Sequence, residues 1–249
     1  MERDQKPNPI EIRHLRKTFG SQTVLDGIAL EVREGETLAV MGRSGTGKSV
    51  LLKLLIGLQT PDSGTIAIRG ENVTGATKDK LNEMRRKIGF LFQQAALYDS
   101  LSIEENVIFP MRRHGNTKPE DQKRHAQELL TSVGMSQDLE KFPSQISGGM
   151  QKRVGLARAL ALDPEILLFD EPTAGLDPIT AGEIGKLIVD LKKKRSLTAV
   201  VVTHDIRGAR TFADRVLLLD KGKIVAEGTF AELQNRQEDF VKQFLADGC

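Results

Sequence analysis

Residues 37–58 are TLAVMGRSGTGKSVLLKLLIGL, and this stretch decides the fold class of the chain. The apolar run at 37–41 predicts a buried strand, and the apolar residues that follow position 49 predict a helix. Between them, residues 42–49 fit the pattern G-x-x-x-x-G-K-[ST]. The pattern binds phosphate when a strand leads into it and a helix leaves it. A simple glycine-rich turn with an N-capping serine is therefore the disfavoured interpretation.

The phosphate loop, residues 42–49, predicts how an anion is bound. Glycines let the backbone wrap closely around phosphate with its N–H groups turned inward, and the helix N-terminus adds partial positive charge. Lys48 is expected to reach the β- and γ-phosphates, and the Ser49 hydroxyl to ligate Mg²⁺. The predicted nucleotide-binding residues here are Gly42, Ser44, Gly45, Thr46, Gly47, Lys48, Ser49 and Val50. The loop alone indicates a nucleoside triphosphate, since kinases, helicases and GTPases share it.

Short apolar runs alternate with helical patterns along the rest of the chain. Strands are predicted from residues 10, 28, 64, 88, 165, 197 and 215, and a turn with an edge strand from residue 221. Buried strands that alternate with helices are typical of a parallel α/β sheet. Residues 101–162 hold several helical patterns and no convincing strand, which predicts a helical subdomain carried on the sheet.

The predicted strand that begins near residue 165 ends in two carboxylates, Asp170 and Glu171. Ligands of α/β proteins bind beyond the carboxyl ends of parallel strands, so both acids are placed at that edge. We expect Asp170 to hold Mg²⁺, through water, and Glu171 to polarise an attacking water as general base. The alternative is that the two acids simply form a polar strand end that caps a loop. The presence of a phosphate loop in the same chain makes this interpretation the less favoured one.

A second anion cradle is predicted at Ser147-Gly148-Gly149, hereafter the signature segment, directly before the helical run QKRVGLARALAL. Ser147 can cap that helix, and the two glycines let backbone N–H groups approach phosphate. Two cradles for one nucleotide are unexpected in a monomer.

The signature segment, with the Arg and Ala residues that follow it, resembles that of the ABC transporter ATPases. The resemblance implies that the signature segment of one subunit closes over ATP held by the phosphate loop of a second copy. It implies a single domain over 1–249, with a RecA-like P-loop NTPase core at about 1–94 and 163–228 and an antiparallel β edge. The helical subdomain is expected at about 95–162 and a C-terminal helical extension at about 229–249.

Other positions match this family in order across nearly the whole chain. The resemblance implies that Phe19 stacks on adenine and that Gln93 senses Mg²⁺ and the γ-phosphate. It implies that His204 contacts the γ-phosphate and that Asp177 belongs to a loop that crosses between subunits. Lys48, Gln93, Glu171 and His204 are thus the expected catalytic residues, and Ser49, Gln93 and Asp170 the expected metal-binding ones. Met150, where many members carry glutamine, is a departure that removes no charged group.

Four further segments narrow the resemblance: residues 96–114, 147–150, 177–180 and 241–245. They are similar to the Mla/MCE-type phospholipid transport ATPases of Gram-negative bacteria. This implies work at the cytoplasmic face of the inner membrane, as a peripheral subunit beside an integral permease and a periplasmic MCE-domain lipid-binding protein. The helical subdomain is expected to receive the permease. An ATPase for import of amino acids or other small solutes, and a non-transport ABC ATPase, are the alternatives.

Composition limits the partners. Lys and Arg number 36 against 34 Asp and Glu, so net charge gives no argument for nucleic acid, and none is expected as a partner. The single cysteine, Cys249, cannot form an internal disulfide, which fits a reducing compartment. The N-terminal residues lack the apolar stretch of a signal peptide. The tail predicts a short helix with one apolar side, expected to pack on its own domain, with a clasp on the partner copy as the alternative.

Overall fold

The computed structural model describes residues 7–114 and 117–246, whose strands form two sheets. A four-stranded antiparallel sheet has the order β2-β1-β4-β5, and a six-stranded sheet has the order β10-β9-β3-β8-β7-β6. The bounds are β1 Ile10–Phe19, β2 Gln22–Val32, β3 Thr37–Met41, β4 Ser63–Ile68, β5 Glu71–Asn72, β6 Ile88–Leu91, β7 Ile166–Asp170, β8 Thr198–Thr203, β9 Arg215–Asp220 and β10 Lys223–Gly228.

The six-stranded sheet is parallel except at one edge. β3 pairs in parallel with β8 and β9, and β7 pairs in parallel with β6 and β8. Only β10, joined to β9 by a tight turn, runs antiparallel within this sheet as the structure describes it. The carboxyl ends of β3 and β7 therefore meet at the same edge, where ligands of parallel sheets bind.

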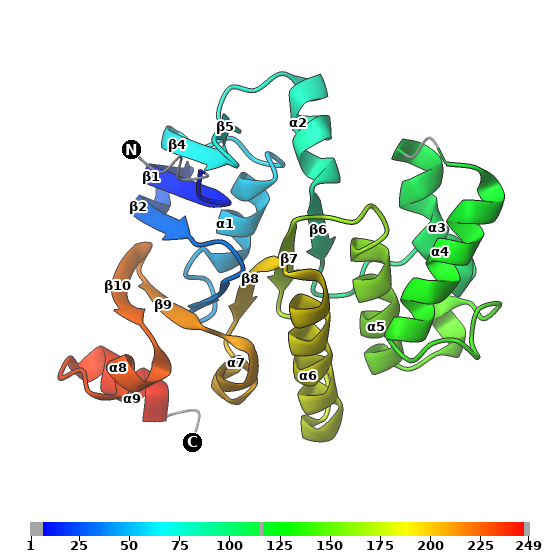
Figure 1. The fold of residues 1–249 in the computed structure, drawn as a ribbon. Helices are drawn as coiled ribbons and strands as arrows, with labels where there is room; N and C mark the ends of the chain where they lie inside the picture. The colour runs from blue at the N-terminus through cyan, green and yellow to red at the C-terminus, as the bar shows by residue number, and fades with distance from the viewer. Residues whose placement is uncertain (1–6, 115–116, 247–249) are drawn as a thin grey trace, which may run out of the picture.

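The helices fall into two groups (Figure 1). Most flank the sheets, while α3, α4 and α5 form a block on one side of the molecule. The helix bounds are α1 Lys48–Leu55, α2 Lys78–Arg86, α3 Ile103–His114, α4 Pro119–Ser132, the 3₁₀ turn Pro143–Gln145, α5 Gly148–Ala159, α6 Pro178–Arg195, α7 Ile206–Phe212, α8 Phe230–Gln234 and α9 Asp239–Ala246.

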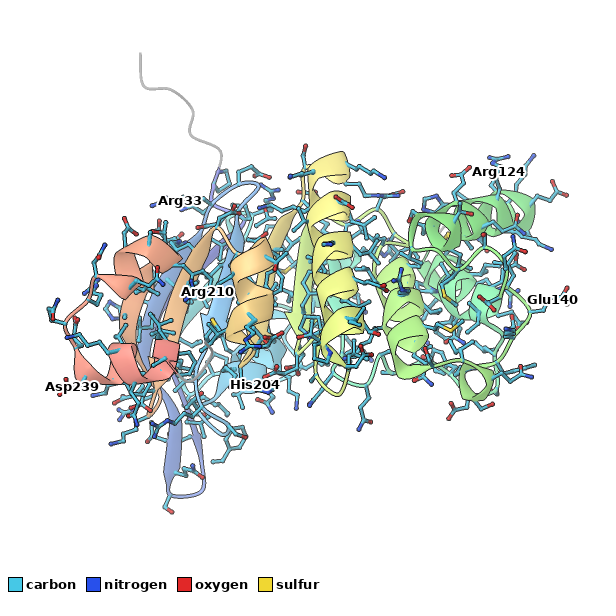
Figure 2. All side chains as sticks on the ribbon, turned by 90° about the horizontal axis from the view of Figure 1, so that it is seen from below. Arg33, Arg124, Glu140, His204, Arg210 and Asp239 are labelled. Atoms are coloured by element: carbon cyan, nitrogen blue, oxygen red, sulfur yellow. The ribbon has the colours of Figure 1, made fainter. Side chains whose placement is uncertain are left out.

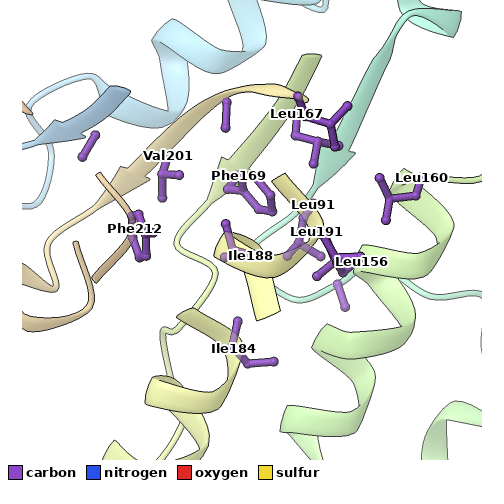
Figure 3. Packing of buried hydrophobic residues seen from close by; sticks show 14 of the residues in the cluster. Leu91, Leu156, Leu160, Leu167, Phe169, Ile184, Ile188, Leu191, Val201 and Phe212 are labelled. Carbon is purple, nitrogen blue, oxygen red and sulfur yellow. The ribbon is translucent and has the colours of Figure 1, made fainter. Parts of the chain in front are cut away.

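The core has two parts, one on each face of the six-stranded sheet. Alternate residues of each buried strand point to opposite faces, so Leu168 and Phe169 belong to different clusters. One cluster joins the sheet to α1 and the antiparallel sheet. The other joins it to α5, α6 and the C-terminal helices, and Figure 3 shows Phe169, Ile184, Ile188 and Leu156 within it. Because both faces of the six-stranded sheet are buried, its central strands are continuous runs of apolar residues.

The predicted fold class, an α/β P-loop NTPase core with an antiparallel β edge and an inserted helical block, is confirmed. The strands we expected are present, and the described part of residues 95–162 contains only helices and turns. One detail escaped the prediction: the two-residue strand β5 is too short to show any periodicity. Ser147 caps α5 as predicted, so that helix begins at Gly148 and includes both glycines of the signature segment. The buried residues of the helical block also continue into the core of the sheet. The exact domain boundaries stay a proposal.

Candidate nucleotide-binding and hydrolysis site

The phosphate loop has the shape that its glycines predict. A Cβ atom at Gly42 would overlap the carbonyl oxygen of Leu219 on the neighbouring strand β9. Gly47 has a φ of 99°, and a Cβ there would lie 2.8 Å from the carbonyl oxygen of Val24. The Thr46 hydroxyl donates to the carbonyl oxygen of Arg43 at 2.9 Å, which closes the loop on itself. Only glycine satisfies the first two positions, so the loop shape follows from the sequence.

The ammonium group of Lys48 is held inside this loop. Its Nζ donates to the carbonyl oxygens of Gly42 at 2.8 Å and Arg43 at 2.9 Å, and the side chain is buried. Burial lowers the pKa of Lys48, while the carboxylates of Glu171 and Asp170 oppose that change. The ammonium group therefore lies within the loop that is predicted to bind phosphate.

The carboxylate of Asp170 lies beside the hydroxyl of Ser49. Ser49 Oγ, in the first turn of α1, donates to Asp170 Oδ1 at 2.9 Å across the carboxyl ends of β3 and β7. Burial raises the pKa of Asp170 above its ordinary value; the hydrogen bond from Ser49 opposes that rise, and the charge of Glu171 adds to it. A cation placed between these oxygens would favour the ionised carboxylate.

These two oxygen donors fit Mg²⁺. That ion prefers hard oxygen ligands and is usually bound through one or two protein groups, with waters and substrate phosphates completing its shell. Within the described residues, no group of three or more His, Cys, Asp or Glu side chains could hold a metal unaided. Mg²⁺ bound by Ser49 and Asp170 would therefore depend on the nucleotide for its remaining ligands.

The carboxylate of Glu171 is fixed by strand β8. It accepts hydrogen bonds from Thr203 Oγ1 at 3.1 Å and from the backbone N–H of His204 at 3.3 Å. His204 Nδ1 lies 2.9 Å from both carboxylate oxygens. Because an ionised carboxylate only accepts, this contact places a proton on Nδ1 and leaves Nε2 to meet a ligand. The His204 side chain is 66% exposed and that of Glu171 only 11%, and Figure 2 shows His204 at the surface.

Most of the predicted site lines one cavity of about 870 Å³. Its size is that of a typical small-molecule site. Thr46 and Asp170 join the same cluster through their hydrogen bonds to Arg43 and Ser49. The predicted residues that line the cavity are Phe19, Gly42, Ser44, Gly45, Gly47, Lys48, Ser49, Val50, Gln93, Glu171 and His204. The sequence thus predicted a set of positions that the fold brings together.

The signature segment and Asp177 do not line this cavity. Ser147 Oγ caps α5 by accepting from the Met150 N–H at 3.3 Å, and Asp177 caps α6 through the N–H groups of residues 179 and 180. The two segments are neighbours, because a Cβ atom at Gly148 would lie 3.9 Å from Leu176. The signature segment and the loop before Asp177 therefore form a surface that is separate from the cavity.

Sequence reasoning missed two groups near the cavity. Phe244 of α9 lines it, and the Arg43 guanidinium lies 5.8 Å from the ring centroid of Phe240. Lys152 of α5 is buried behind Gln93 and Glu171. No spacing in the sequence predicts these contacts, because Arg43 and Phe240, like Lys152 and Gln93, are more than fifty residues apart. Lys152 and Glu171 are closer in sequence, but no motif links them.

A phosphate loop after β3 and two acids at the end of β7 define a P-loop nucleotide site, and the comparisons with known proteins identify the family. The family model for ABC transporters matches residues 25–174. This chain belongs to that family, and it is an ATPase of the kind that the family couples to transport.

Two relatives and two solved structures show how close the match is. The probable ribonucleotide transport ATP-binding protein mkl of Mycobacterium leprae is 42% identical over 95% of this chain and 68% of its own. The methionine import ATP-binding protein MetN of Rhizobium johnstonii is 43% identical over 88% of this chain and 60% of its own. The chain thus spans about two thirds of the length of these relatives.

The solved structures are of the bacterial ABC transporter cassette MJ0796. Its dimer bound to ADP and Pi aligns with a TM-score of 0.81 at 36% identity, over 88% of this chain and 98% of that one. A second dimeric structure of the same cassette gives a TM-score of 0.82. Among the described helices, none is both long and apolar enough to span a membrane.

Proposed function

We propose that this chain hydrolyses ATP as half of a dimer. Lys48 and Ser49 of one copy bind the phosphates and Mg²⁺, and Ser147 and Gly149 of the second copy cover them. The observation that supports this is the separation of the signature segment from the cavity of its own chain. The dimeric state of the MJ0796 cassette is consistent with it.

Glu171 is proposed as the general base, and the Glu171–His204 pair carries this assignment. Its carboxylate is directed toward the cavity by three hydrogen-bonding groups of residues 203 and 204. Nε2 of His204 donates to the γ-phosphate when the imidazole carries a proton on both nitrogens, and Gln93 and Asp170 face the metal. Phosphoryl transfer depends mainly on positioning and charge neutralisation, which such a rigid cluster provides.

The permease is proposed to dock in a groove beside the helical block. This groove of about 410 Å³ lies between β6, α3 and α5 and is separate from the nucleotide cavity. Aromatic rings dominate it: Phe90 and Phe92 are 4.2 Å apart, and Tyr98 and Phe109 are 4.6 Å apart, between centroids. Tyr98 is 46% exposed. An exposed aromatic groove is typical of a protein-binding site, and Gln93 lies next to it in sequence.

The cargo that we propose is phospholipid, moved between the inner and outer membranes to maintain lipid asymmetry. The support is the resemblance of residues 96–114, 147–150, 177–180 and 241–245 to Mla/MCE-type ATPases. The chain would lie at the cytoplasmic face of the inner membrane as a peripheral subunit. A periplasmic MCE-domain protein would complete the assembly. Import of a small solute is the second candidate, favoured by the 43% identity to MetN.

Purification of the tagged protein from its native membranes in mild detergent tests this assignment. Mass spectrometry of the bound proteins and lipids is the readout. We expect a permease, an MCE-domain protein and phospholipid. A permease with a solute-binding protein would overturn the lipid assignment and leave ATP hydrolysis intact. Absence of any membrane partner would favour a non-transport ABC ATPase.

A further inference from the structure

A buried ammonium group lies directly behind the proposed hydrolytic site. Lys152, in the second turn of α5, is only 5% exposed. Its Nζ donates to the carbonyl oxygen of Glu171 at 3.1 Å and also to that of Gln93. One side chain therefore holds the backbones of two residues that face the nucleotide cavity.

The cost of burying this cation indicates a specific role. Burial lowers the pKa of Lys152, and the carboxylates of Asp170 and Glu171 counter it. A buried Lys is rare unless it is paired, and here its hydrogen-bond partners are main-chain carbonyls rather than a carboxylate. The arrangement keeps both carboxylates available to ligands on the other side.

Glu171 needs such support because its backbone is strained. It has a φ of 49°, in the left-handed region that side-chain-bearing residues rarely adopt. Its N–H donates to the carbonyl oxygen of Val202 at 2.8 Å, and Lys152 binds the carbonyl at its other end. A strained backbone conformation at a functional site is maintained when several neighbouring contacts hold it in place.

We propose that Lys152 is a positioning residue that couples the signature helix α5 to the hydrolytic groups of its own subunit. This rests on the proposed roles of Glu171, Gln93 and the signature segment. α5 starts at the segment that covers the partner's ATP, and Lys152 follows Ser147 by little more than one turn. A shift of α5 when ATP is enclosed at one site therefore moves the backbone of the general base at the other.

The test measures steady-state ATP hydrolysis, nucleotide affinity and thermal unfolding of the full chain. Lys152→Met keeps the length of the side chain and removes its charge and donors. We expect kcat to fall at least about tenfold, while KM for Mg·ATP and the affinity for a fluorescent ATP analogue change less than about threefold. Lys152→Arg, which keeps a buried cation with donors, should retain more activity than Lys152→Met. Lys123→Met, on exposed helix α4, is the matched control and should match wild type.

The outcomes separate this inference from the proposed function. A kcat for Lys152→Met within twofold of wild type would overturn the positioning role. So would equal losses of kcat and of bound nucleotide that follow a lowered Tm, because these indicate a structural role alone. If Lys152→Met does not fold, Lys152→Gln is judged by the same criteria. If the wild-type protein hydrolyses no ATP, the proposed hydrolytic function fails instead.

Discussion

At the scale of single residues, the site is organised by contacts between charged groups and the strand ends. Glu171 accepts from Thr203 and contacts His204, while Asp170, the preceding residue, faces Ser49. Adjacent carboxylates thus point to different partners. In the proposed mechanism, Asp170 would therefore bind the metal while Glu171 activates the attacking water.

Glu171→Gln tests the assignment of the base. The change preserves shape but removes the negative charge that would accept a proton from water. We expect turnover to fall at least about 10²-fold while ATP still binds. Hydrolysis assays and equilibrium binding of ATP measure the two effects. Wild-type activity in this variant would reject Glu171 as the base.

A buried ion pair outside the site ties β9 to the residue before β3. Arg215 binds both carboxylate oxygens of Glu36, at 2.6 and 2.9 Å. The side chains are 13% and 8% exposed. Burial alone would raise the pKa of Glu36, but hydrogen bonds from Arg215 and from the Arg33 N–H lower it below its ordinary value.

Arg215→Met should lower the free energy of unfolding by about 3 kcal/mol at pH 7, because it leaves Glu36 buried without its partner. The pKa of Glu36 is lower in the folded state than its ordinary value of 4.5. The ion pair therefore contributes fully to the free energy of unfolding above about pH 4.5, and this contribution is lost as pH falls through the folded-state pKa. Urea denaturation at several pH values should therefore show that the variant and the wild type differ less in free energy of unfolding below the folded-state pKa of Glu36. The double variant Glu36→Gln/Arg215→Met should lose less than the single one; an equal or larger loss would contradict this.

At the scale of elements, the helical block packs on the sheet by close backbone approach. α5 lies against β6, where a Cβ atom at Gly89 would overlap the carbonyl oxygen of Ala159 and the Leu167 side chain. Gly155 of α5 meets Leu91 and Ala95 in the same way, with a Cβ at 2.7 Å from Leu91 Cδ1. Small residues on both elements thus set the distance between them.

Gly89→Ala is predicted to destabilise the protein by about 1–3 kcal/mol, because the overlapping atom belongs to backbone and cannot rotate away. Gly182→Ala is the matched control: it lies in α6 with nothing within 4 Å of the new Cβ. In a helix that change should stabilise by up to about 1 kcal/mol. Urea denaturation midpoints compare the two. Equal changes in the midpoint would contradict this prediction, because they would show that the interface between α5 and β6 accommodates the added methyl group.

The C-terminal helix α9 also acts at this scale. Val241, Phe244 and Leu245 are buried in its own chain, as the apolar side of the tail predicts. This supports packing on its own domain. What the periodicity did not reveal is that the helix stops beside the phosphate loop, where Phe244 becomes part of the cavity wall.

At the scale of the whole molecule, the chain carries two separate surfaces that the proposed dimer would join. The phosphate loop belongs to one cavity, while the signature segment and the loop before Asp177 form another surface. In the proposed arrangement, neither surface encloses a nucleotide by itself. In a two-fold symmetric dimer, the phosphate loop of each copy would face the signature segment of the other, and both sites would be complete.

Gly148→Asp tests that arrangement. The new Cβ has room in the single chain, and an acid suits the first turn of α5, so the protein should still fold and bind ATP through its own loop. The added charge would repel the partner's phosphates. In the Glu171→Gln background, sedimentation velocity should show an ATP-dependent dimer that Gly148→Asp abolishes. A dimer that survives the substitution would count against the proposed interface.

Much of the fold and of the candidate site was predictable, because the signals are local. The strand, loop and helix at 37–58 follow from periodicity and from glycines that no other residue can replace. Asp170, Glu171 and His204 stand at strand ends, so the parallel sheet brings them together once its strands are recognised. The two-residue strand β5 escaped prediction, because it is too short to have a periodic pattern.

The sequence by itself determined the fold class, the family and most of the predicted residues that line the cavity, since each depends on a motif of a few neighbouring residues. Only the tertiary structure decided that Lys152 supports Gln93 and Glu171, that Arg215 pairs with Glu36, and that Phe244 closes the cavity. These contacts arise when distant segments pack, and a lysine or phenylalanine on a helix looks the same in sequence whether it faces water, a core or a catalytic loop.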